Sequence, residues 1–194
     1  MYYLPADKSY LEVKFKLTNN TASTVENVRI WVGTRDDWVG DTDRPTKQKG
    51  NLVDGEFLMI TDPADRATAI LISSGDEGVL FYTESDKGNT VINNYGSLGN
   101  IINLDPQTSQ IENSIDGSYG FYVRMDDLLP GESEEFTWFY AAGELANLEQ
   151  IIQDVADVSS DMEYTYTGAT FSATTPEDAT GYYIVVDSGS VAYT

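Results

Sequence analysis

The sequence has no cysteine and no histidine, and its 11 Lys and Arg stand against 32 Asp and Glu, a net charge of −21. Without cysteine there are no disulfides, and without histidine there is no Ser-His-Asp or Cys-His hydrolysis. The usual zinc sites are excluded as well, because they are built from Cys and His. Any bound metal must therefore accept oxygen ligands, as Ca²⁺ and Mg²⁺ do.

Two classes of partner are excluded by the same shortages. A chain this acidic repels phosphate backbones, and it has no basic stripe, so we expect no nucleic-acid partner. The charge also disfavours contact with an anionic membrane leaflet. No apolar run approaches the ~20 residues that a membrane span needs, so we expect no membrane insertion.

The length and hydrophobic content predict a folded chain with a real core. With 194 residues and 41% hydrophobic residues, it should bury roughly 70% of its unfolded surface. We expect residues 1–160 to form one ligand-binding β-sandwich domain. Residues 161–194 then either complete the sandwich with further strands or belong to a companion domain.

Alternating apolar and polar residues predict strands. Leu11, Val13, Phe15 and Leu17 point to one face of a first strand, and a second strand spans residues 28–32. Because the connection between them is short, we expect these two strands to pair antiparallel. Further strands are predicted at residues 56–61, 67–73, 78–83, 118–125, 134–141, 163–173 and 182–187.

One amphipathic helix stands out among these strands. Its apolar stripe consists of Leu145, Leu148, Ile151, Ile152, Val155 and Val158. Asn147 and Gln150 are predicted to form a capping box at its start. We expect a hairpin corner at the Pro-Gly turn in residues 128–132 and mostly irregular structure in residues 90–116. The predicted fold is a mostly β, antiparallel sandwich with one helix packed on it.

Residues 33–55 lose periodicity and predict a long polar loop, and such loops are usually functional or disordered. Four carboxylates fall within eight residues of this loop: Asp36, Asp37, Asp41 and Asp43. Ca²⁺ takes six to eight oxygens at ~2.3–2.6 Å, which converging Asp side chains supply. Without a cation, carboxylates held this close repel one another. A solvated acidic loop stays an equal alternative, because the spacing is not that of an EF-hand.

Trp38 lies in the middle of this loop among polar residues. An exposed Trp is a good anchor for a peptide or sugar, whereas a Trp plug that fixes the loop to the core is the alternative. Paired carboxylates can hydrolyse glycosides, but among 32 acidic residues such a pair arises by chance. We therefore expect no enzyme.

Two segments carry a family resemblance. Residues 28–57 (VRIWVGTRDDWVGDTDRPTKQKGNLVDGEF) and 116–152 (DGSYGFYVRMDDLLPGESEEFTWFYAAGELANLEQII) resemble the peptide-binding domain near the distal end of giant bacterial repeats-in-toxin (RTX) adhesins. The first motif is the more specific, and together they cover most of residues 10–155. The resemblance implies an extracellular, monomeric module at the bacterial cell surface, within a long adhesin that leaves by type I secretion and serves cell adhesion and biofilm formation.

The resemblance also implies a partner and a site. The partner is the C-terminal peptide of a protein on a host or partner cell, with Ca²⁺ in or beside the site. On this hypothesis the metal ligands are Asp36, Asp37, Asp41 and Asp43. The peptide-binding residues are Arg35 or Arg44 for the terminal carboxylate, Trp38 for packing, and Asn51 or Asp54 for the peptide backbone. The cation reverses the local field that would otherwise repel an anionic peptide.

Other functions fit the same residues. A calcium-dependent lectin would use the acidic loop to bind sugar hydroxyls through the ion, with Trp38 as a stacking platform. A spacer domain that calcium only rigidifies is a third reading, and a carbohydrate-active enzyme is the fourth.

Overall fold

The computed structural model describes residues 2–4, 8–94 and 105–158. Its larger sheet is antiparallel throughout and consists of β1 (Tyr2–Tyr3), β2 (Tyr10–Thr18), β11 (Ser133–Glu144), β7 (Glu77–Thr83), β6 (Ala69–Ser74), β4 (Thr46–Val53) and β5 (Glu56–Met59), in that order, with β9 (Glu112–Asn113) also paired to β4. The smaller sheet contains β3 (Arg29–Thr34), β10 (Gly117–Arg124) and β8 (Gly88–Asn94). One α-helix, α2 (Leu145–Val158), and a 3₁₀ turn, η1 (Pro106–Thr108), complete the described elements.

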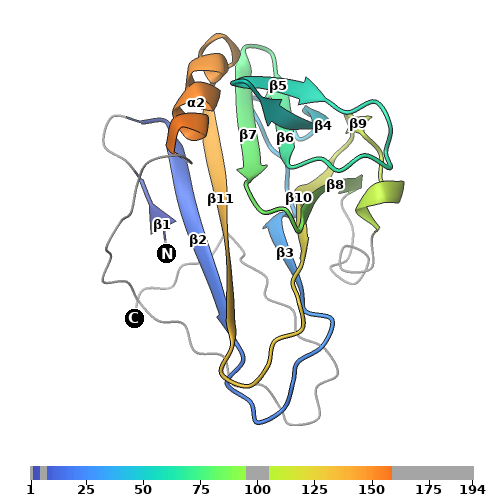
Figure 1. The fold of residues 1–194 in the computed structure, drawn as a ribbon. Helices are drawn as coiled ribbons and strands as arrows, with labels where there is room; N and C mark the ends of the chain where they lie inside the picture. The colour runs from blue at the N-terminus through green and yellow to red at the C-terminus, as the bar shows by residue number, and fades with distance from the viewer. Residues whose placement is uncertain (1, 5–7, 95–104, 159–194) are drawn as a thin grey trace, which may run out of the picture.

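The main core lies between the two sheets (Figure 1). Inward-facing residues of β3 and β10, such as Val32 and Phe121, meet Phe81 and Trp138 of the larger sheet. The rings of Phe81 and Phe121 stack with their centroids 4.2 Å apart. Such aromatic pairs add to the stabilisation that burial alone gives. The predicted mostly β sandwich is confirmed.

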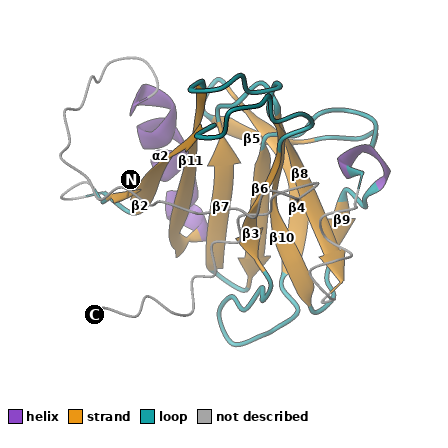
Figure 2. Cartoon of the chain, turned by 90° about the horizontal axis from the view of Figure 1, so that it is seen from below, coloured by secondary structure: helices purple, strands orange, loops and turns teal. Residues whose placement is uncertain are grey.

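A second core lies on the opposite face of the larger sheet, under α2. Leu148, Ile152 and Val155 of the helix are buried against Leu80 and Phe139 of the sheet. Figure 2 shows the helix on the outside of the strands, next to β11 and β2. The apolar stripe of the sequence therefore predicted the buried side of the helix correctly. The capping box is wrong, because the helix begins at Leu145 and Asn147 lies inside its first turn, where its side chain donates to Glu144.

The predicted pairing of the first two long strands is wrong. β2 pairs with β1 and β11, whereas β3 pairs with β10 in the other sheet. The short connection between them crosses from one sheet to the other, and so does the Pro-Gly corner between β10 and β11. Asn19 joins the two crossings: its side chain donates to the Leu128 carbonyl at 2.8 Å, and its own carbonyl accepts from the Gly131 N–H at 2.7 Å. The corner is therefore not a hairpin.

The predicted 33–55 loop is shorter than expected, because residues 46–53 form β4. β4 has lysines, not apolar residues, at two of its inward positions, so its alternation escaped detection. Likewise β8, η1 and β9 occupy part of the predicted irregular segment 90–116. The strands predicted at residues 163–173 and 182–187, and the unit 161–194, lie outside the described residues. No helix in the described ranges is long and apolar enough to cross a membrane.

Candidate functional site

The connection from β3 to β4, residues 35–45 (here the β3–β4 loop), is a compact turn and not an extended strand. Val39 and Thr42 exchange two backbone hydrogen bonds of 3.1 and 3.3 Å. Between them Gly40 has a φ of 64°, a left-handed conformation that glycine adopts without strain. At the start of the loop the Thr34 hydroxyl accepts from the Asp36 N–H at 3.1 Å. The Val39 side chain is buried in the main core, so the loop is tied to the sandwich.

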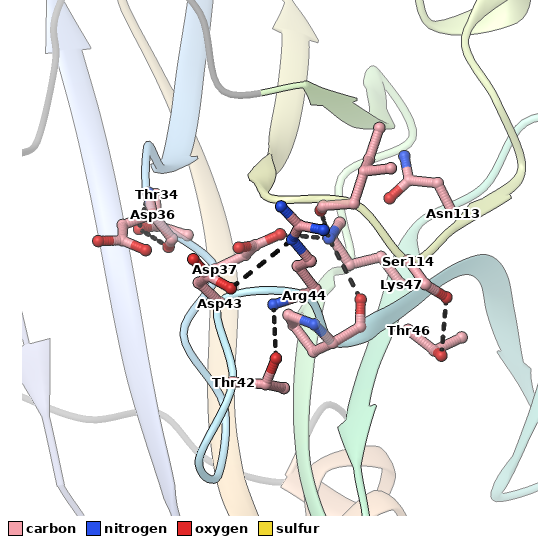
Figure 3. A network of polar contacts seen from close by, with 12 residues as sticks. Thr34, Asp36, Asp37, Thr42, Asp43, Arg44, Thr46, Lys47, Asn113 and Ser114 are labelled. Carbon is pink, nitrogen blue, oxygen red and sulfur yellow. Dashed lines mark hydrogen bonds and ion pairs between the residues drawn. The ribbon is translucent and has the colours of Figure 1, made fainter.

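A fully buried ion pair lies directly beneath this loop. The Lys47 ammonium of β4 contacts the Asp37 carboxylate, and both side chains have no exposed surface. The same ammonium donates to the Ile115 carbonyl at 2.7 Å and to the Pro45 carbonyl at 3.3 Å (Figure 3). An ammonium has three hydrogens, so its donors are matched by three acceptors, two from the β3–β4 loop and one from the segment before β10.

Asp37 is less well satisfied than its partner. Among the described residues no donor meets the geometry of a hydrogen bond to its buried Oδ1 atom, while Oδ2 accepts from Lys47. Burial raises the pKa of Asp37, and this outweighs the lowering by the Lys47 hydrogen bond and charge and by the Gly117 backbone. A carboxylate in such surroundings depends on the adjacent ammonium to stay ionised. Lys47 is therefore the group that most favours the charged form of Asp37, against a pKa that burial raises.

The other predicted metal ligands do not join Asp37. Asp36 and Asp41 are exposed, and the half-buried Asp43 lies 3.9 Å from Arg44 Nε. Figure 3 shows the Asp36 and Asp37 side chains pointing in different directions. Within the described ranges, no three acidic side chains come close enough together to hold a metal ion. The four loop aspartates therefore do not fit the calcium site that the sequence suggests, and calcium binding by the chain stays a prediction.

Three of the predicted ligand-binding residues share the β3–β4 loop and face solvent. Trp38 is 62% exposed, and its Nε1–H donates to the Gly40 carbonyl at 3.2 Å, which fixes the indole. The Arg44 side chain is 71% exposed, and Arg35 is also an exposed residue. The loop thus presents one aromatic ring and two guanidinium groups.

The other two predicted ligand-binding residues have structural contacts away from this loop. Asn51 lies on β4, where its side-chain oxygen accepts from the Thr68 N–H at 2.9 Å and its amide donates to the Arg66 carbonyl at 3.0 Å. Asp54 lies in the turn between β4 and β5 with a φ of 52°. Among the described residues, no contact joins Asn51 or Asp54 to Trp38.

Lys49 is a buried group that the sequence argument missed. Its ammonium has no exposed surface and donates to the Pro106 carbonyl at 2.9 Å and to the Ser109 hydroxyl at 3.1 Å. Burial lowers its pKa to about 8, against a smaller raising effect of the Asp105 charge. Two lysines at positions i and i+2 of a strand point to the same face, which was the signal available in the sequence.

The buried Lys49 predicts a pH dependence of stability. Its pKa of about 8 in the folded state lies below the ordinary 10.5, so above pH 8 the unfolded chain binds the extra proton and stability rises with pH. Urea titrations from neutral pH to about pH 9.5 should show this rise, before tyrosine ionisation sets in. Lys49→Met should abolish it. An equal rise in that variant would assign the effect to another group.

Comparison with known proteins assigns no family to this site. No protein-family model matches the chain, and no curated protein matches it either. What can be said of the site therefore comes from its own geometry: a compact loop, held from below by a buried ion pair, that presents an exposed indole and exposed guanidinium groups.

Proposed function

We propose that the chain is a ligand-binding module of an extracellular bacterial adhesin, and that its β3–β4 loop captures C-terminal peptides of proteins on other cells. The observation that supports this most is the contrast between two neighbouring residues. Trp38 is 62% exposed, whereas Asp37 next to it is 1% exposed and paired with Lys47. An exposed indole on a loop that is anchored from beneath is well suited to bind a partner.

Pre-organisation is the physical reason for this suitability. Ordering a mobile side chain costs roughly 0.5–1.5 kcal/mol on binding. The Trp38 indole is already held by its hydrogen bond to Gly40, and the backbone beneath it by the Val39–Thr42 pair. Trp residues are enriched among the few interface residues that carry most of the binding energy. The loop therefore offers a large apolar contact at a low entropic cost.

Arg44 and Arg35 suit the terminal carboxylate of such a peptide. A guanidinium binds a carboxylate through two parallel hydrogen bonds. Without local positive charge, a chain with a net charge of −21 would repel an anionic peptide. Calcium enters the proposal only through the family resemblance, since the described loop carboxylates do not converge on one site. Asp37 is excluded from calcium binding by Lys47.

Removal of the indole tests the proposal. Trp38→Ala should weaken binding to peptides with a free C-terminus by about 2 kcal/mol, roughly 30-fold, as expected for a central aromatic anchor. Binding is measured on arrays of peptides with free or amidated C-termini, followed by titration calorimetry on the best peptide. Leu129→Ala is the matched control, because Leu129 is 57% exposed at the distant β10–β11 corner.

Two results would contradict this proposal. Equal binding by Trp38→Ala and the unchanged chain would remove the indole from the site. Indifference to amidation would remove carboxylate capture. Glycan arrays are run in parallel, since the same exposed indole can stack on a sugar ring. Binding to glycans but to no peptide would replace the proposal with the lectin alternative.

A further inference from the structure

Lys47 bonds to the same kinds of oxygen atoms that calcium binds. Its ammonium contacts a carboxylate from the β3–β4 loop (Asp37), a backbone carbonyl at the end of that loop (Pro45) and a carbonyl between β9 and β10 (Ile115). Calcium sites in loops are likewise built from carboxylates and backbone carbonyls of separate segments. Here one positive charge, supplied by the chain itself from β4, joins the β3–β4 loop to the segment between β9 and β10 (Figure 3).

We infer that Lys47 takes the place of calcium as the organising cation of the β3–β4 loop, so that the loop keeps its order and presents Trp38 without a divalent ion. This departs from the calcium-organised loop that the family resemblance implies. Only the consequence for ligand binding rests on the proposed function. The order of the loop itself follows from the contacts of Lys47.

Calcium and Lys47 exclude each other at Asp37. Both side chains have no exposed surface, so a cation that reached the Asp37 carboxylate would lie next to a buried ammonium. Like charges repel far more strongly in the interior than in water. Moving Lys47 aside would leave its ammonium buried without partners, which is strongly unfavourable. The remaining loop carboxylates are exposed or half-buried, and affinity for calcium falls as the charge and rigidity of the ligand set fall.

A second lysine of the same strand extends this arrangement. The Lys49 ammonium donates a hydrogen bond to the Pro106 carbonyl, and the Lys49 backbone N–H donates one to the Ile111 carbonyl at 2.8 Å. β4 also pairs with β9 at residues 47 and 48. Residues 105–115 are thus held along their length by β4, with one buried ammonium near each end. Two of only 11 basic residues are used here, and both serve backbone oxygens.

Amide hydrogen exchange of the loop, with and without calcium, tests the inference on the unchanged chain. The reciprocally bonded amides of Val39 and Thr42 report loop order directly by NMR. In excess EDTA their protection should stay within about twofold of the value in millimolar calcium. Lys47→Met should lower it by at least about tenfold in either solution, because the loop then opens locally.

The opposite pattern would overturn the inference. If chelation of the unchanged chain removes the protection of Val39 and Thr42, and calcium restores it, then calcium organises the loop. This experiment needs no peptide, so it remains decisive if no peptide binds. If the proposed function holds, EDTA should not reduce the contribution that Trp38 makes to the affinity for the best peptide. Asp36→Asn with Asp41→Asn, which removes exposed carboxylates only, should leave the amide protection unchanged.

Discussion

Replacing Lys47 by methionine is expected to lower the free energy of unfolding by about 3–5 kcal/mol, because it leaves the buried Asp37 carboxylate without its counter-charge. The Ile115 carbonyl loses the Lys47 ammonium as its hydrogen-bond donor at the same time. Urea unfolding followed by circular dichroism at neutral pH measures the loss. The loss should shrink on acidification, because burial already raises the pKa of Asp37 and protonation removes the unpaired charge.

Lys49→Met provides the matched control for this prediction. The same change is made two residues away on the same strand, at a side chain that is equally buried. Among the described residues no carboxylate bonds to the Lys49 ammonium, and the Pro106 carbonyl keeps the Ser109 hydroxyl as a donor at 2.9 Å. We therefore expect a change within about 1 kcal/mol, since an apolar replacement also removes a costly buried charge.

A double variant separates the charge from the loss of packing. Asp37→Asn together with Lys47→Met leaves neither member of this ion pair charged, so its loss should be clearly smaller than the sum of the two single losses. Additive losses, or a Lys47→Met variant as stable as Lys49→Met, would show that the ion pair is not what holds the loop.

Gly33→Ala is expected to be the second large effect, with a loss of about 3 kcal/mol or a failure to fold. A Cβ at Gly33 would lie 2.2 Å from the Tyr119 carbonyl oxygen and 2.5 Å from the Gly120 Cα. Both are backbone atoms of β10, the only strand that pairs with β3 among the described strands, so no side-chain rotation relieves the contact. The β3–β4 loop follows β3 directly and would be displaced with it.

Gly143→Ala on β11 is the control for this substitution. There an added Cβ meets only the end of the Ile151 side chain, at 3.3 Å, and a flexible chain end can move aside. We expect a change within about 1 kcal/mol. Thermal and urea unfolding of the two variants give the comparison. Equal stabilities would mean that β3 and β10 can separate enough to admit a methyl group.

The sequence predicted the elements whose buried residues are apolar. The alternation in residues 11–17 and the stripe of α2 both mark a surface that buries hydrocarbon, so β2 and the buried side of the helix were found. An exposed Trp38 was one of the two alternatives that the sequence offered, because an aromatic ring in a polar loop has few apolar neighbours along the chain.

The rest of the site lay beyond sequence patterns, because its buried groups are charged. β4 carries Lys47 and Lys49 where a strand normally carries apolar residues, so its periodicity was hidden. Asp37 is set apart from Asp36, Asp41 and Asp43 by its pairing with Lys47, ten residues further along the chain. Lys47 is held in turn by the Ile115 carbonyl, 68 residues from it. Local spacing shows neither partner. The crossings at Asn19 and Gly131 were missed for a related reason, since a short connection fits a hairpin and a sheet crossing equally well.

The pairing of β2 with β11 has a consequence for how the chain reaches this fold. Thr18 and Ser133 face each other in the ladder although 115 residues separate them along the chain. Closing so long a segment delays the contact, and sheets dominated by distant pairings form slowly, in milliseconds to seconds. Until β11 has been synthesised, β2 and β7 each lack a neighbour and expose unpaired edges that invite association with other chains. The nascent polypeptide therefore commits to its sandwich late, once nearly all of the described sequence is present.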